Sequence, residues 1–99
     1  MKDIQSYKFL EELKELSFIN EIWLFGSRGR GDNAERSDID LAIICPKASD
    51  SDWRCVLNVI SNADTLLKID CVRFDHLAKD DKLRENIVRC KKIIYSRSA

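Results

Sequence analysis

Hydrophobic residues recur with two different periods along the chain, which divides its first half into a helix and two strands. Near the amino terminus apolar residues return every three or four positions between lysines and glutamates, and this predicts an amphipathic helix over residues 3–17. The apolar run 22–25 is too short for a helix and indicates a strand. Residues 37–45, which become β-branched and end before Pro46, indicate a second, largely buried strand.

The second half of the chain repeats this change between helical and extended patterns. Asp50 or Ser51 is expected to cap a helix, and residues 67–74 form the third expected strand. Apolar spacing then predicts a helix over residues 80–91, and residues 92–95 are expected to form a short last strand. The order α-β-β-α-β-α-β predicts an α/β (α+β) fold, in which helices flank a small mixed β-sheet.

Length and composition fit one domain over residues 1–99, because 44% of the residues are hydrophobic and can form a core. Seventeen basic and seventeen acidic side chains cancel, so no uniformly basic surface favours direct DNA binding or membrane association. Apolar runs stay far below the ~18 residues of a membrane span and no signal peptide opens the chain, so we expect a soluble, cytoplasmic protein. Four cysteines without C-x-x-C spacing and a single histidine, His76, argue against a zinc site and a disulfide framework.

All three glycines fall in one hexapeptide, residues 26–31, whereas an average chain of this length has roughly seven spread along it. Backbone N–H groups of a tight turn there can form a nest for an anion, and Gly26 lets a phosphate approach without a Cβ in the way. Ser27 adds a hydroxyl, while Arg28 and Arg30 add positive charge suited to phosphate oxygens. The alternative is a flexible, hairpin-like connection whose arginines face solvent. The other two glycines are expected to serve the turn toward the second strand.

Acidic residues in the second and third strands suggest a metal site. Asp38 and Asp40 are two positions apart, so in a strand they share a face with Cα atoms about 6.6 Å apart. If the third strand lies beside the second, Asp70 can face the same side, and the three carboxylates can hold two divalent cations about 4 Å apart. The alternatives are that the first two acids are simply solvated and that Asp70 is an edge-strand acid paired with Lys68 or Arg73.

Taken together, these residues carry a long bipartite motif. Gly26-Ser27 after a short apolar strand, Asp-x-Asp at the start of the next strand and the later Asp70 resemble the polymerase β-type nucleotidyltransferase superfamily. The short length and the string Gly-Ser-Arg-Gly-Arg-Gly, followed by Ser-Asp-Ile-Asp-Leu, are similar to the minimal nucleotidyltransferases, over roughly residues 20–95. The resemblance implies the palm-like nucleotidyltransferase fold of polymerase β.

The resemblance also implies a reaction, the transfer of a nucleoside monophosphate from an NTP, with ATP and AMP as the expected pair, to an acceptor hydroxyl. Asp38, Asp40 and Asp70 would be both the catalytic residues and the ligands of two Mg²⁺ ions, and Asp70 would also help to deprotonate the acceptor.

In the same resemblance, Gly26 and Ser27 would bind the β- and γ-phosphates of the nucleotide. Arg28 and Arg30 would assist nucleotide binding or face solvent.

A partner protein is the last implication of the resemblance. Relatives of this kind are often paired with a HEPN-type helical toxin, which the antitoxin adenylylates on a tyrosine within a hetero-oligomer. The alternative is a non-catalytic binding module that neutralises or regulates the HEPN partner by forming a complex. Six basic residues against Glu85 within residues 82–97 give weak support for a partner surface, and a solvated helix face is the simpler alternative.

Overall fold

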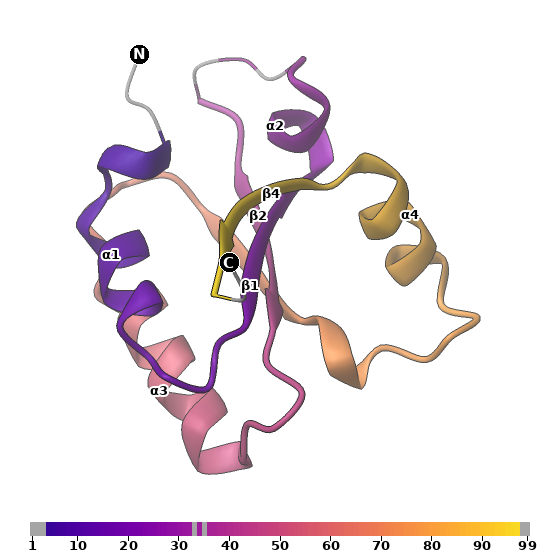
Figure 1. Ribbon diagram of the computed structural model, residues 1–99. Helices are drawn as coiled ribbons and strands as arrows, with labels where there is room; N and C mark the ends of the chain where they lie inside the picture. The colour runs from indigo at the N-terminus through magenta and orange to yellow at the C-terminus, as the bar shows by residue number, and fades with distance from the viewer. Residues whose placement is uncertain (1–3, 33, 35, 98–99) are drawn as a thin grey trace.

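The computed structural model describes residues 4–32, 34 and 36–97, and its centre is a four-stranded mixed β-sheet (Figure 1). The strands are β1 Glu21–Phe25, β2 Ile39–Ile44, β3 Ile69–Arg73 and β4 Lys92–Ser96. They lie in the order β3-β2-β1-β4, with β2 and β3 parallel and β1 antiparallel to both β2 and β4. The sheet and its helices confirm the α/β class, and all four expected strands are present.

Helices lie on both faces of this sheet. The α-helices are α1 Lys8–Lys14, α2 Gly26–Arg30, α3 Asp50–Ser61 and α4 Lys82–Cys90, and two short 3₁₀ turns are Ile4–Ser6 and Phe74–His76. Figure 1 shows α1 and α3 on one face, α4 on the opposite face and α2 at one end of the sheet. Within the described residues, no helix is both long enough and apolar enough to cross a membrane.

The face under α1 and α3 holds the main hydrophobic core. Alternate residues of β2, namely Ile39, Leu41 and Ile43, are 0% exposed there. They belong to one cluster with apolar side chains of both helices, among them Leu10 and Val56. Burying an aliphatic side chain of this size stabilises a fold by about 1.5–3 kcal/mol. This layer therefore supplies much of the stability.

The opposite face carries a smaller cluster beneath α4. It is made by Trp23, Phe25, Ala42, Phe74 and Ile87, and the rings of Trp23 and Phe74 meet edge to face with centroids 4.8 Å apart. A pocket remains beside this cluster, so part of the α4 face is open.

The amino-terminal helix is shorter than the periodicity predicts. Instead of one helix over residues 3–17, a 3₁₀ turn and α1 are separated at Tyr7, whose backbone is extended with φ −76° and ψ 135°. The Asp64 carboxylate accepts hydrogen bonds from the N–H groups of Lys8 and Phe9 at 3.1 and 3.2 Å. A residue beyond the end of α3 thus satisfies the first N–H groups of α1, and the local pattern does not reveal it.

The cap of α3 also differs from the expected residue. Ser49, rather than Asp50 or Ser51, is the N-cap, and its Oγ accepts from the Asp52 N–H at 3.1 Å. The Asp52 carboxylate accepts from the Ser49 N–H at 3.0 Å in return. This reciprocal pair is a capping box, in which an Asp takes the place of the usual Glu or Gln.

The glycine-rich segment forms the short helix α2 where a tight turn was predicted. Gly26 opens it with a φ of +65° and Gly31 ends it with a φ of +84°, both in the left-handed region that favours glycine. The Gly31 N–H donates to the Ser27 carbonyl at 2.9 Å and closes the helix. Two sharp changes of direction therefore flank α2, and glycine permits both.

Candidate active site

Two carboxylates meet on the α4 face of the sheet. The parallel register of β2 and β3 pairs Asp40 with Asp70, and the antiparallel register of β1 and β2 pairs Phe25 with Asp40. Directly paired residues of neighbouring strands direct their side chains to the same face. The prediction that Asp70 shares a face with Asp40 is therefore confirmed.

Asp38 lies just before β2 and not inside it. The strand was expected to begin at Ser37, but it begins at Ile39. Its side chain is exposed. The strand alternation that was expected to align Asp38 with Asp40 therefore does not extend to it. Its charge still acts on Asp40, because it raises the pKa of that carboxyl group.

The environment of Asp40 disfavours its ionised form. Burial raises the pKa of Asp40, and a hydrogen bond with Asp70, the charge of Asp70 and the charge of Asp38 raise it further, while Lys68 lowers it. Carboxylates this close repel each other unless a proton or a cation relieves the repulsion. Oxygen ligands of this kind are those that Mg²⁺ takes, so the residues fit a divalent cation.

The carboxylate site consists of two residues that the sheet brings together and a third that lies outside the sheet. Within the part of the chain that the structure describes, no three acidic, histidine or cysteine side chains are already arranged to hold a metal ion. The fold itself assembles Asp40 and Asp70, and Asp38 contributes its charge from the preceding segment.

Asp70 also forms an ion pair with Lys68, which was one of the alternatives for this residue. Asp70 lies on the edge strand β3, and its carboxylate is 3.7 Å from the Lys68 Nζ, with side chains 46% and 69% exposed. Arg73 is not its partner, because the Arg73 guanidinium instead pairs with Asp50 at 3.1 Å. An ion pair this exposed contributes little to stability, so it leaves Asp70 available for other interactions.

Gly26 brings the start of α2 against the carboxylate pair. A Cβ at Gly26 would collide with Oδ2 of Asp40, and its φ of +65° also disfavours any other residue. Ser27 follows in the first turn of α2, where backbone N–H groups have no partner inside the helix. An anion held by this turn would lie next to Asp40.

The two arginines of the segment have different surroundings. Arg28 donates from Nη2 to the Ser37 carbonyl at 2.9 Å and from Nε to the Asp38 carbonyl at 3.3 Å. It therefore ties α2 to the segment that carries Asp38. Arg30 pairs with Asp32 at 3.1 Å on the exposed side of the helix. Nucleotide binding by either arginine stays a prediction.

Gly29 has a role that the sequence analysis missed. It was assigned to the turn, but it lies within α2, where a Cβ would be 2.6 Å from the Cys90 carbonyl oxygen and 2.7 Å from that of Leu24. Gly29 therefore lets α2 pack closely against β1 and the end of α4. The prediction was correct only for Gly31, which ends the helix.

A pocket of about 330 Å³ opens beside the carboxylates. Its lining combines the two acids with apolar side chains, namely Phe25, Asp40, Asp70, Cys71, Val72 and Leu83. Burial raises the pKa of Cys71 to about 12, which favours the neutral thiol at physiological pH. The apolar residues of this lining look like core positions in the sequence. They lie beside the two acids only because of the sheet register and the packing of α4.

Comparisons with known proteins agree with this arrangement. A family model described as polymerase beta, nucleotidyltransferase, matches residues 8–99. The fold is similar to a toxin-antitoxin crystal structure with AMP-PNP, with a TM-score of 0.64 and 21% identity over 92% of this chain and 75% of that chain. It is also similar to a candidate nucleotidyltransferase from Sulfolobus solfataricus, with a TM-score of 0.55 and 22% identity over 91% and 79% of the two chains. Among curated protein sequences there is no match.

Proposed function

The chain belongs to the polymerase β-type nucleotidyltransferase family, and on that premise we propose that it transfers AMP from ATP to a hydroxyl with Mg²⁺ as cofactor. The observation that carries the proposal is the Asp40–Asp70 pair in contact with Gly26 at the start of α2. Nucleotidyl transfer needs a triphosphate site and a cation site at one place, because a cation would neutralise the negative charge of the phosphates where the bond breaks.

The sheet order arranges the parts of this reaction in a row. The turn at Gly26 follows β1, Asp40 lies on β2 and Asp70 lies on the edge strand β3. Main-chain N–H groups at Gly26 and Ser27 bind the β- and γ-phosphates, the two acids hold the cation, and the acceptor enters from the β3 side.

In the reaction, the acceptor oxygen attacks the α-phosphorus of ATP. A P–O bond to the acceptor forms, the P–O bond to the β-phosphate breaks, and pyrophosphate leaves with the bonding electrons. The acceptor proton passes to the Asp70 carboxylate, which lies on the edge strand β3 and is 46% exposed. Asp40 and Asp70, with Asp38 nearby, would hold Mg²⁺, which would supply positive charge to offset the triphosphate.

The acceptor is proposed to be a tyrosine of a HEPN-type toxin, so that the chain acts as its antitoxin in a hetero-oligomer. This part rests on the family resemblance and on the structural similarity to a toxin-antitoxin with AMP-PNP. The apolar wall of Phe25, Val72 and Leu83 beside the acids suits an aromatic hydroxyl better than a sugar hydroxyl.

The proposal is tested by incubating the purified chain with ATP, Mg²⁺ and the HEPN protein encoded beside it, followed by intact-mass and peptide mass spectrometry. We expect the partner to gain AMP on a tyrosine, and we expect Asp40→Asn to abolish this gain. Glu12→Gln is the matched control, because Glu12 is an exposed carboxylate on α1, away from the α4 face. An unmodified, folded partner would count against the proposal.

A second function has one observation in its favour, the absence of a preassembled three-residue metal site among the described residues. In that case the chain is a non-catalytic module that neutralises its partner by complex formation. The double variant Asp38→Asn and Asp40→Asn separates the two, because a binding module keeps full neutralisation without these acids and an enzyme loses it.

A further inference from the structure

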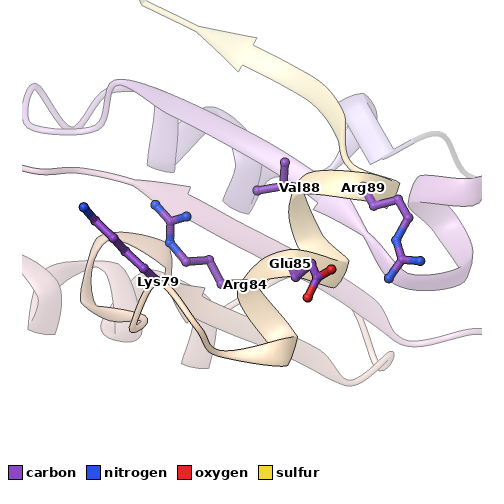
Figure 2. A pocket seen from close by; sticks show the side chains of 5 residues that line it. All are labelled: Lys79, Arg84, Glu85, Val88 and Arg89. Atoms are coloured by element: carbon purple, nitrogen blue, oxygen red, sulfur yellow. The ribbon is translucent and has the colours of Figure 1, made fainter.

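A second hollow of about 470 Å³ lies along α4, and its lining does not include the two carboxylates. It is lined by Lys79, Arg84, Glu85, Val88 and Arg89, which come from α4 and the loop before it. We call this surface the α4 groove. In the view of Figure 2, Lys79 and Arg84 lie on one side of Glu85 and Arg89 lies on the other.

The α4 groove has an excess of unpaired positive charge. In the described part of the chain, none of its four charged residues takes part in a salt bridge. Arg84 is held in place, because its guanidinium carbon lies 4.7 Å from the centre of the Phe74 ring. Three cations against one acid give the groove a net charge that attracts an anionic partner.

The α4 groove is not purely ionic. Val88, one of its lining residues, is 46% exposed, and Glu85 adds a negative charge among the cations. A nucleic acid backbone would meet Glu85 as a like charge and would leave Val88 unused. A protein segment can present acidic side chains to the cations, an apolar side chain to Val88 and a basic side chain to Glu85, so it fits this surface better.

The α4 groove is also next to the catalytic pocket. Leu83 lines that pocket, and the following residues of the same helix, Arg84 and Glu85, line the groove. A protein bound in the groove therefore lies within one helical turn of the pocket that contains Asp70. This continuity points to the acceptor protein as its occupant.

We propose that the α4 groove docks an acidic, amphipathic segment of the acceptor protein and so brings the acceptor hydroxyl to the carboxylate pair. Acids of the segment face Lys79, Arg84 and Arg89, and an apolar side chain covers Val88. The identity of the occupant rests on the proposed function, but docking itself is measurable without transfer.

The test is the charge reversal Lys79→Glu with Arg89→Glu, because both side chains are exposed. Binding of the purified HEPN partner is measured by calorimetry at several salt concentrations, and the kinetics of AMP transfer are measured beside it. We expect the Kd and the KM for the partner to rise about tenfold or more, with kcat and the KM for ATP unchanged. Arg54→Glu, an exposed arginine on α3, is the matched control and should change neither by more than about twofold.

A second variant, Val88→Ser, keeps the test valid if the charge reversal harms folding, which thermal denaturation reports. It should weaken partner binding without changing the salt dependence. Partner binding equal to wild type in both variants overturns the docking proposal, even if transfer occurs. Binding that these variants weaken, in a wild-type protein that transfers no AMP, supports docking and overturns only the proposed function. A single-stranded RNA oligonucleotide that competes with the partner through the same residues also overturns the assignment to a protein.

Discussion

The two faces of β2 differ in what they contribute to the protein. Ile39, Leu41 and Ile43 are 0% exposed beneath α1 and α3, while Asp40 and Ala42 face α4. Adjacent residues of one strand thus separate a closed core from an open, charged pocket. Strand alternation therefore puts the residues that stabilise the fold on one face and the residues of the candidate site on the other. A substitution on one face is expected to change stability or activity with little effect on the other property.

The largest effect on stability is expected on the closed face. Leu41→Ala should lower the free energy of unfolding by about 2–5 kcal/mol, because it leaves a cavity in a fully buried layer. Urea denaturation measures the loss. Transfer activity per folded molecule, measured well below the melting temperature, should stay within a few-fold of wild type. A large loss of activity in the folded fraction would show that the two faces are coupled.

At the junction of the faces, Gly29→Ala is expected to lower the free energy of unfolding by about 1–3 kcal/mol, because the new methyl group meets the carbonyls of Cys90 and Leu24. Helix propensity alone predicts the opposite sign, since alanine favours helices over glycine by roughly 1 kcal/mol. Thermal or urea unfolding decides between them. Gly31→Asn is the control, because asparagine tolerates a left-handed φ and no atom of the described residues lies within 4 Å of a Cβ at this position.

Gly26→Ala should lower stability by about 1–2 kcal/mol through its left-handed φ, and it should reduce AMP transfer more than tenfold by displacing the Asp40 carboxylate. Unfolding and transfer are measured on the same samples. The stability cost should shrink when Asp40 is already alanine, because the colliding oxygen is gone. An equal loss of stability from Gly26→Ala with Asp40 and with alanine at position 40 would show that Gly26 and the Asp40 carboxylate are not coupled.

The smallest effect, and the one with an unusual sign, is expected from Asp40→Asn in metal-free protein. Because the pKa of Asp40 is raised on folding, the folded state binds more protons than the unfolded state, and stability falls as pH rises through that window. The variant should therefore melt a few degrees higher than wild type at neutral pH and no higher at a pH below the unfolded pKa. Calorimetry across this pH range measures it, and a lower melting temperature at neutral pH would contradict a repulsive carboxylate pair.

The local pattern of the sequence predicts much of this molecule. Alternation assigned Ile39 and Leu41 to one face and Asp40 to the other, and it placed Asp70 with Asp40 once the strands were assumed to be neighbours. Motif spacing also selected Gly26, which contacts the Asp40 carboxylate.

Long-range contacts explain what the sequence did not predict. Asp64, beyond the end of α3, accepts from the first N–H groups of α1, and Gly29 leaves room for the backbone carbonyl of Cys90, so neither role has a local signal. Arg28 donates to the main-chain carbonyls of Ser37 and Asp38, which its charge alone does not indicate, and nucleotide binding by Arg28 stays a prediction. Leu83 reached the pocket only through the packing of α4.

The most direct test of the central claim compares ATP labelled on the α-phosphate with ATP labelled on the γ-phosphate, with Mg²⁺ and the purified HEPN-type protein that is proposed as the partner. Wild-type protein and Glu12→Gln should leave α-label on the partner and release γ-label as pyrophosphate, and Asp40→Asn, although folded and at least as stable, should do neither. Label transfer at the wild-type rate by Asp40→Asn, or transfer of the γ-label to the partner, would contradict a nucleotidyltransferase that works through the carboxylates of the α4 face.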